Sequence, residues 1–256
     1  MRLLIFLIFI TSQITYIFTS SLCSCENRYA SPRLEDLHLD KCRLEDSACM
    51  VNAFQKGIAT FSKGLPEWGV AAMDVMEFDD PVQIDIAGLS LCFNDGRLKG
   101  LENIIIKNIE WDANNHTIYV EYNAPSLVLT GKYLADGQVL LLPIVGDGDM
   151  KVKLKNTDVN VLIFLDVYKR SDKTYVSIKN YKYDFNVGLG RYNLTNLFNG
   201  DKELGNTVLK LMNDNWQQIA LQFSRPVMDT VANQIFRNVD RFLAYAPLED
   251  ISLSFK

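Results

Sequence analysis

Apolar residues recur at helical spacing in two regions of the chain. The first stripe has steps of three and four residues, which place its members on one helical face: Val51, Phe54, Ile58, Phe61 and Leu65. Gly64 and Pro66 follow as signals for the end of a helix. The pattern predicts a helix from Ala48 to about Leu65, followed by an ordered apolar loop that leads to the strands.

The second stripe runs through the last third of the chain, from Leu204 to Phe242. A continuous helix of about 40 residues would be about 60 Å long, whereas a compact globule of about 230 residues would be about 45 Å across. Either Pro226 breaks the helix or the molecule is elongated. We expect one long helix that is kinked at Pro226, because the proline ring meets the carbonyl of Gln222.

Between these regions, apolar and polar residues alternate with the period of a strand. The segments with this pattern include Val82–Ile86, Asn103–Trp111, His116–Tyr122, Ser126–Leu134, Gln138–Val145, Val159–Val167 and Tyr181–Val187. The pair Asp136–Gly137 is typical of a tight hairpin turn. Short links between successive strands predict an antiparallel meander. We therefore expect one α+β domain, elongated, with the sheet wrapped along the long helix.

The N-terminal segment is typical of a secretory signal peptide. Met1 and Arg2 precede the apolar run LLIFLIFI, and small residues flank Cys23 and Cys25. We predict a signal peptide at residues 1–25, cleaved after Cys23 or Cys25, and a secreted extracellular domain at residues 26–256. The alternative is an uncleaved anchor. Glycosylation sequons at Asn115 and Asn193 fit an extracellular glycoprotein.

An oxidising compartment favours one disulfide among the remaining cysteines, Cys42, Cys49 and Cys92. Cys42 and Cys49 are the favoured pair. On one continuous helix their Cα atoms would lie about 10.5 Å apart, whereas a disulfide requires about 4.4–6.8 Å. The chain must therefore turn between them, with Asp46 or Ser47 as the N-cap of the helix. Cys92 falls in an alternating segment, and we expect it to be a buried free thiol.

Charge and hydropathy exclude two classes of partner. The formal net charge of −5 gives no basic footprint for nucleic acid. Lys151, Lys153 and Lys155 alternate, as on one polar face of a strand. After the N-terminal segment, no stretch approaches about 18 unbroken apolar residues. We therefore expect no nucleic-acid partner and no stable membrane insertion.

The sequence carries little that could support catalysis. Its two histidines, His38 and His116, have no neighbours typical of an active site, and we expect both at the surface. The motifs of serine hydrolases, zinc proteases and phosphate-binding loops are absent. Carboxylates are plentiful, but their spacing selects no acid–base pair. We predict a protein that is not an enzyme and uses no cofactor or metal.

The stretch LLLPIVGDGDM, Leu140–Met150, could be a calcium loop, a phosphate cradle or a backbone device. A calcium loop that begins at Asp147 would place Lys151 among its ligands, which repels the ion. A phosphate cradle would lead into a helix, but a strand-like stretch follows. Gly146 and Gly148 are therefore interpreted as a turn, a bulge or a close approach of two backbones.

The chain resembles the insect takeout / haemolymph juvenile-hormone-binding protein family. The resemblance covers nearly all of the mature chain and rests on the early cysteine pair and on three stretches: KGLPEWGV, LLLPIVGDGDMKVKL and LTNLFNGDKELGNTVLKLMNDNWQQI. It implies a strongly curved antiparallel sheet wrapped around one long helix, similar to half of a tubular lipid-binding (TULIP-like) protein. For the hormone-binding branch of the family, the resemblance implies a second disulfide late in the chain. No cysteine follows Cys92 in this sequence, so the chain is more similar to the takeout branch.

The resemblance also implies a function. Such a protein would carry one small hydrophobic ligand, terpenoid-like or fatty-acid-like, in an internal tunnel, in haemolymph or another extracellular fluid, and takeout-like members are linked to circadian physiology. Tunnels of this kind favour aromatic and Met side chains. Our candidate ligand-binding residues are Phe54, Ile58, Phe61, Trp68, Met73, Met76, Tyr133, Trp216, Ile219 and Phe223. The alternative is a membrane-associated lipid-transfer or protein-interaction module without a dedicated hormone ligand.

Overall fold

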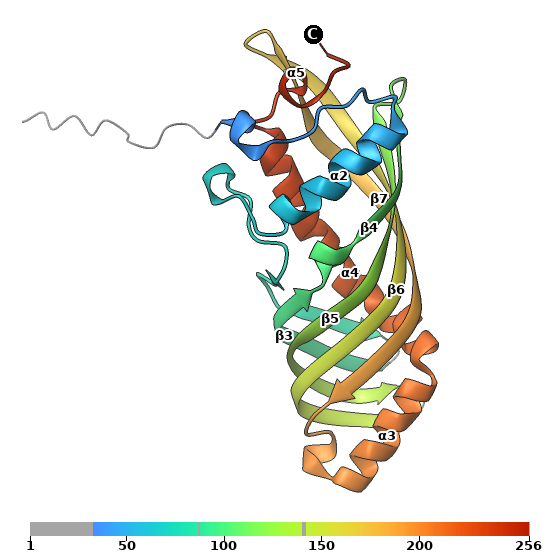
Figure 1. The fold of residues 1–256 in the computed structure, drawn as a ribbon. Helices are drawn as coiled ribbons and strands as arrows, with labels where there is room; N and C mark the ends of the chain where they lie inside the picture. Colours follow the sequence, from blue (N-terminus) through green and yellow to red (C-terminus); the bar gives the residue numbers. More distant parts are fainter. Residues whose placement is uncertain (1–32, 87, 140–141, 256) are drawn as a thin grey trace, which may run out of the picture. The chain divides into compact units, whose positions relative to one another are not determined.

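One antiparallel sheet dominates the molecule (Figure 1). The computed structural model describes residues 33–86, 88–139 and 142–255, so the predicted signal peptide and its cleavage site lie outside the described residues. The strands are β1 (Met76–Glu77), β2 (Val82–Ile86), β3 (Leu89–Lys99), β4 (Ile105–Asp112), β5 (Thr117–Val139), β6 (Leu142–Arg170) and β7 (Lys173–Leu194). Their order is β1-β3-β5-β6-β7, while β2 pairs with β3 and β4 pairs with β5.

The predicted meander is therefore only partly right. Strands β5, β6 and β7 follow one another in sequence and in space, but β3 and β4 do not pair with each other. Each of them instead pairs with a different part of β5, β4 with residues 117–123 and β3 with residues 128–136.

Four α-helices and four short 3-10 helices complete the described part of the chain. The α-helices are α2 (Ser47–Phe61), α3 (Lys202–Asp214), α4 (Trp216–Leu243) and α5 (Leu248–Ile251). The 3-10 helices are η1 (Leu34–Leu37), η2 (Pro66–Trp68), η3 (Leu101–Asn103) and η4 (Phe198–Gly200). The sheet curves around α4, as Figure 1 shows, which confirms the predicted architecture of a curved sheet around a long C-terminal helix.

The C-terminal helical stripe is interrupted, but not at the predicted place. The prediction of one helix from Leu204 to Phe242 is wrong, because Asn215 leaves helical geometry at φ −109° and ψ 27° and separates α3 from α4. Its side-chain amide donates to the carbonyl of Leu211 at 2.8 Å, a local bond with which Asn competes against helix propagation. Pro226 lies inside α4, which continues through it to Leu243.

The predicted turn at Asp136–Gly137 is also wrong. Both residues are paired within the β5–β6 ladder, opposite Val145 and Ile144, and β5 is one continuous strand from Thr117 to Val139. Glycine is nevertheless required at position 137. Its φ is +133°, and an added Cβ would lie 2.0 Å from the carbonyl oxygen of Gly88. Because Gly137 has no side chain, the turn between β2 and β3 can lie close to the backbone of β5. From the local sequence alone, a glycine with this role looks the same as a glycine in a hairpin turn.

Halfway along the longest strands, the alternation of inward and outward side chains shifts by one residue. On β5 the inward positions are even-numbered up to Ala124 and odd-numbered from Leu127 onward. The shift occurs at Pro125, which has no N–H for the ladder, and at the facing residue on β6, Asn156, which has φ +50°. On β7, Gly188 lies against Asn156, and an added Cβ would be 3.1 Å from the Cβ of that residue. The sheet therefore presents two inner surfaces with different side chains.

Helix α4 is joined to the sheet at both of its edges. On one side the Asp240 carboxylate accepts a hydrogen bond at 2.8 Å from the backbone N–H of Ile178, on β7. On the other side Gln234 donates at 2.7 Å to the carbonyl of Glu77, on β1. Asn238 is 2 % exposed and bonds both backbone groups of Ala71. These bonds satisfy backbone groups at sheet edges that would otherwise remain unpaired.

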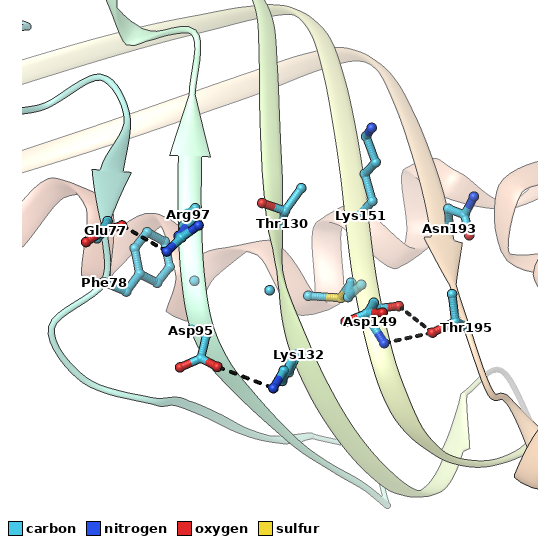
Figure 2. Close-up of a pocket in the computed structure, with 13 residues that line it drawn as sticks. Glu77, Phe78, Asp95, Arg97, Thr130, Lys132, Asp149, Lys151, Asn193 and Thr195 are labelled. Carbon is cyan, nitrogen blue, oxygen red and sulfur yellow. Dashed lines mark hydrogen bonds and ion pairs between the residues drawn. The ribbon is translucent and has the colours of Figure 1, made fainter.

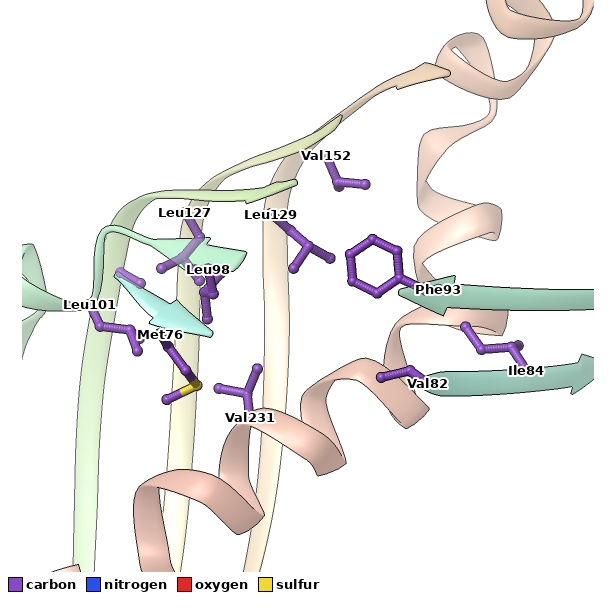
Figure 3. Packing of buried hydrophobic residues seen from close by; sticks show 11 residues of the cluster. Met76, Val82, Ile84, Phe93, Leu98, Leu101, Leu127, Leu129, Val152 and Val231 are labelled. Atoms are coloured by element: carbon purple, nitrogen blue, oxygen red, sulfur yellow. The ribbon is translucent and has the colours of Figure 1, made fainter. Parts of the chain in front are cut away.

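The half of the sheet nearer α3 is filled with side chains. Met76 lies beside Val231 of α4 in Figure 3, and Phe93, Leu127 and Leu129 belong to the same buried cluster. A second cluster around Tyr133 and Ile219 continues this core toward α3.

The two glycines of the LLLPIVGDGDM stretch are close approaches, and not bulges. Residues 142–155 of β6 pair with β5 without a register shift. An added Cβ at Gly146 would lie 2.5 Å from the Tyr133 hydroxyl oxygen, and one at Gly148 would lie 2.5 Å from the carbonyl oxygen of Thr195. Asp147 and Asp149 are exposed. The glycines therefore make room for Tyr133 and for the segment after β7.

We predict that Gly146→Val destabilises the fold by about 1–3 kcal/mol, because the new side chain would overlap the Tyr133 ring in a filled core. Urea denaturation would measure this as a lower midpoint. The matched control is Gly57→Ala in α2, where the nearest atom to the new Cβ lies 3.9 Å away; it should leave stability unchanged or raise it by up to about 1 kcal/mol. Equal midpoints for both variants would contradict the close-approach interpretation.

Candidate functional site

The half of the molecule nearer α2 holds a cavity of about 420 Å³. It lies between α2, the inner face of β4 to β7, and α4, and nearly all of its lining is apolar. The inner face of β5 and β6 contributes Ile118, Val120, Tyr122, Val159, Val161 and Ile163, and α4 contributes Met228, Ala232, Ile235, Phe236 and Val239. A volume of this size falls in the range of small-molecule sites.

Helix α2 covers one side of this cavity, and polar residues on the helix fix its position. Asp46 caps the helix by accepting from the backbone N–H of Cys49 at 3.0 Å, which confirms one of the two predicted N-caps. The Gln55 side chain bonds the backbone at the start of β4 twice, donating to the carbonyl of Ile104, just before the strand, at 2.9 Å and accepting from the N–H of Ile106 at 2.8 Å. Met50, Ala53, Phe54, Ile58 and Phe61 then line the cavity.

The predicted disulfide is confirmed. Cys42 and Cys49 are bonded, with their Cα atoms 5.7 Å apart, which is possible because the chain turns at Asp46 before α2 begins. The bond joins the start of α2 to Cys42, whose carbonyl accepts from the N–H of Leu253 at 2.8 Å. The C-terminal segment and the start of α2 are therefore tied together beside the cavity.

Cys92 has no disulfide partner among the described residues. It is half-buried and not fully buried as expected, because its position in β3 is on the outer face. Its thiol lies 3.6 Å from the side-chain oxygen of Asn94.

Four of the ten candidate ligand-binding residues line the cavity. Phe54, Ile58 and Phe61 do so from α2, and Met73 does so from the loop that follows it. Phe54 is also 43 % exposed, so it lies at the boundary between the cavity and solvent.

The other six candidates lie elsewhere in the core. Met76, Ile219 and Phe223 belong to the filled half of the sheet, and Trp68 packs with Phe242 at a ring distance of 5.8 Å. Trp216 lies against β7, with its ring 3.0 Å from the position of a Cβ at Gly190.

Tyr133, the candidate for orienting a ligand, is completely buried, and its hydroxyl donates to the carbonyl of Thr195 at 2.7 Å. The cavity lining also includes residues of β5, β6 and α4, whose apolar periodicity was visible in the sequence. The pattern of apolar residues does not show which half of the long strands lines the cavity and which half packs in the core.

Two tyrosines face the cavity, Tyr122 and Tyr183. The Tyr183 hydroxyl donates to Asp229, and the Arg225 guanidinium lies 4.4 Å from its ring centre. Burial, followed by this hydrogen bond, raises the pKa of Tyr183 above its ordinary value. Burial alone raises the pKa of Tyr122 to about 12. Both side chains are therefore neutral at physiological pH.

A second depression, of about 830 Å³, is lined mostly by polar and charged residues and lies on the outer face of the sheet (Figure 2). Arg97, Thr130, Lys151 and Asn193 form one row across four paired strands. Several of its charges are paired, for example Arg97 with Glu77 at 3.2 Å. This depression is more open to solvent than the apolar cavity, so the apolar cavity is the stronger candidate site.

Both predicted glycosylation residues, Asn115 and Asn193, are exposed, and so are His38 and His116. Attachment of a glycan at either asparagine stays a prediction. Among the described helices, none is long and apolar enough to cross a membrane.

Comparison with known proteins identifies the family of the chain. The model of the family described as haemolymph juvenile hormone binding protein matches residues 17–253. The chain belongs to this family. It is similar to the circadian clock-controlled protein daywake of Drosophila melanogaster, at 29% identity over 223 residues, which cover 83% of this chain and 86% of that protein. The daywake protein of Drosophila yakuba is 30% identical over 213 residues, 78% of this chain and 81% of that protein.

A solved structure supports the same placement. The crystal structure of Epiphyas postvittana Takeout 1 matches with a TM-score of 0.81 and 41% identity, covering 83% of this chain and 99% of that chain. The resemblance to the takeout / haemolymph juvenile hormone binding protein family is therefore confirmed, together with its fold.

We predict that alkaline pH destabilises the fold through buried tyrosines. Burial raises the pKa of Tyr122, Tyr133 and Tyr192 to about 12, from an ordinary value of about 10. Because the folded state holds these protons more tightly, their contribution to stability is complete below about pH 10 and is lost as the pH rises toward 12. Denaturation midpoints should fall between pH 10 and pH 12. In the folded protein, part of the tyrosinate absorbance should appear only near pH 12. A tyrosine titration that is complete near pH 10 in the folded protein would contradict the prediction.

Proposed function

We propose that this protein is a secreted, non-enzymatic carrier that binds one small hydrophobic molecule in the cavity beneath α2. The observation that carries the proposal is the cavity itself, about 420 Å³ with a nearly apolar lining, beside a densely packed cluster of buried side chains. Apolar burial is the main driving force for such binding. Membership of the haemolymph juvenile hormone binding protein family supports a terpenoid-like or fatty-acid-like ligand.

The lining favours binding without chemical conversion. The carboxylate at its edge, Asp40, is paired with Lys56 at 2.6 Å. Ser62 and Ser252 donate to backbone carbonyls, at 3.3 and 3.2 Å. Neither serine has the adjacent base that a nucleophile requires.

The entry route proposed for the ligand passes beside Phe54. This residue is part of the lining and is also exposed to solvent. Helix α2 is held to β4 through Gln55 and to the chain before it through the disulfide. This route would therefore depend on movement of the Phe54 side chain and not on release of the helix.

The decisive experiment is to fill the cavity from α2. Ala53 lines the cavity, whereas Ala59 is exposed on the opposite face of the same helix. We predict that Ala53→Trp weakens the binding of an apolar fluorescent probe at least about tenfold, equivalent to about 1.4 kcal/mol. Ala59→Trp should leave affinity within about twofold, since an exposed substitution away from the site changes little.

Native mass spectrometry of the protein purified from its own fluid would identify the natural ligand. Absence of a bound small molecule, together with unchanged probe binding in Ala53→Trp, would contradict the carrier function.

A further inference from the structure

We infer that a cluster of cations on the outer face of the sheet docks the protein on lipid surfaces that carry negative charge. This basic cluster consists of five exposed residues from three strands: Lys99, Lys151, Lys153, Lys155 and Arg191. Their side chains point away from α4, because the alternating neighbours Leu98, Val152 and Tyr192 pack in the core. The chain as a whole carries a formal net charge of −5, so the cluster does not follow from its composition.

Strand pairing concentrates these charges. Lys153 lies directly opposite Arg191 on β7, and Val128 of β5 separates it from Lys99 on β3. Neighbouring strands are about 4.8 Å apart, and alternate residues of one strand are about 6.6 Å apart. Neighbouring cations are therefore closer than the Debye length of about 8 Å in physiological salt, so their repulsion is only partly screened. Like charges that face each other directly across two strands destabilise a sheet.

The charges of the basic cluster are not compensated within the part of the chain that the structure describes. None of the four lysines forms an ion pair there, and the Arg191 guanidinium donates to a carbonyl, that of Asn213, at 3.2 Å. In the other half of the sheet, by contrast, Lys107 is paired with Asp158 at 2.7 Å. An external negative surface would supply the compensation that the fold lacks.

The surroundings of the cluster indicate which kind of anion it binds. The depression of Figure 2 shares Lys151 with the cluster, but Glu77, Asp95 and Asp149 also line it and would repel an anion that entered. The other four cations stand outside this depression. Lysine is a hydrated point charge that imposes little geometry on its partner. Such cations suit the diffuse field of a lipid surface, where each one contributes about fivefold to affinity.

Vesicle flotation would test the inference with two lipid compositions, phosphatidylcholine alone and a mixture of phosphatidylcholine with phosphatidylserine. We expect binding to the mixture only, and weaker binding as salt is added. Every protein in the comparison carries Asn193→Gln, because a glycan on Asn193 would stand opposite Lys151. In this parent protein, Lys153→Gln combined with Lys155→Gln should weaken binding to the mixture at least about tenfold, since two cations are lost.

The matched control combines Lys63→Gln with Lys169→Gln, two exposed lysines outside the basic cluster, and changes the net charge equally. It should bind the mixture within about twofold of the parent protein, because charges beyond a Debye length are screened. The variant of Lys153 and Lys155 should keep or raise the thermal midpoint, since it removes the repulsion between Lys153 and Arg191. A loss of fold therefore does not imitate the expected result.

The outcomes decide between this inference and its alternatives. Absence of parent binding to the mixture, equal binding to both lipid compositions, or equal weakening in the two double variants would overturn it. Binding to soluble heparin but to neither vesicle would assign the cluster to an acidic polymer and would also overturn it. The carrier function is measured separately, as binding of the apolar probe without vesicles, so failure of either proposal leaves the other intact.

Discussion

The attachment of α4 to both edges of the sheet is the constraint on which the rest of the structure depends. A curved sheet that does not close on itself has unpaired backbone groups along two edges. Asp240 bonds the β7 edge, and Gln234 and Asn238 bond the β1 edge and the loop before it. These polar contacts hold the helix over the concave face, so that the apolar side chains between helix and sheet stay out of water. The cavity can remain unfilled because its walls are fixed by these edge contacts and not by side chains that meet across it.

Local patterns predicted the elements that are determined locally. The apolar stripe and Asp46 gave the position of α2, and the geometry of a disulfide gave the turn between Cys42 and Cys49. Asn215 and Gly137 were not predicted, for a shared reason. Asn215 ends α3 by a side-chain bond to Leu211, and Gly137 accommodates a carbonyl from a turn that is distant in sequence. The local sequence around Asn215 is equally compatible with a continuous helix, and the sequence around Gly137 is equally compatible with a hairpin turn.

The candidate site was harder to predict because its residues differ from the core in surroundings and not in type. Tyr133 and Tyr122 lie on the same strand and both face inward, yet the first donates to Thr195 in a filled region and the second faces an open space. The sequence contains both tyrosines, but the shift of alternation at Pro125 separates their environments. Six of the ten candidates lie outside the cavity lining, and the β6 and α4 residues of that lining were recognised only as strand and helix.

The shift at Pro125, Asn156 and Gly188 also has an evolutionary consequence. It divides the long strands into a densely packed segment and a segment that lines the cavity, and the two have different inward positions. Substitutions on the cavity side can enlarge, shrink or repolarise the interior while the densely packed side continues to supply folding stability. A lineage with this arrangement can change the shape of its cavity in small steps, because the side chains around Phe93 and Leu129 pack in a separate cluster.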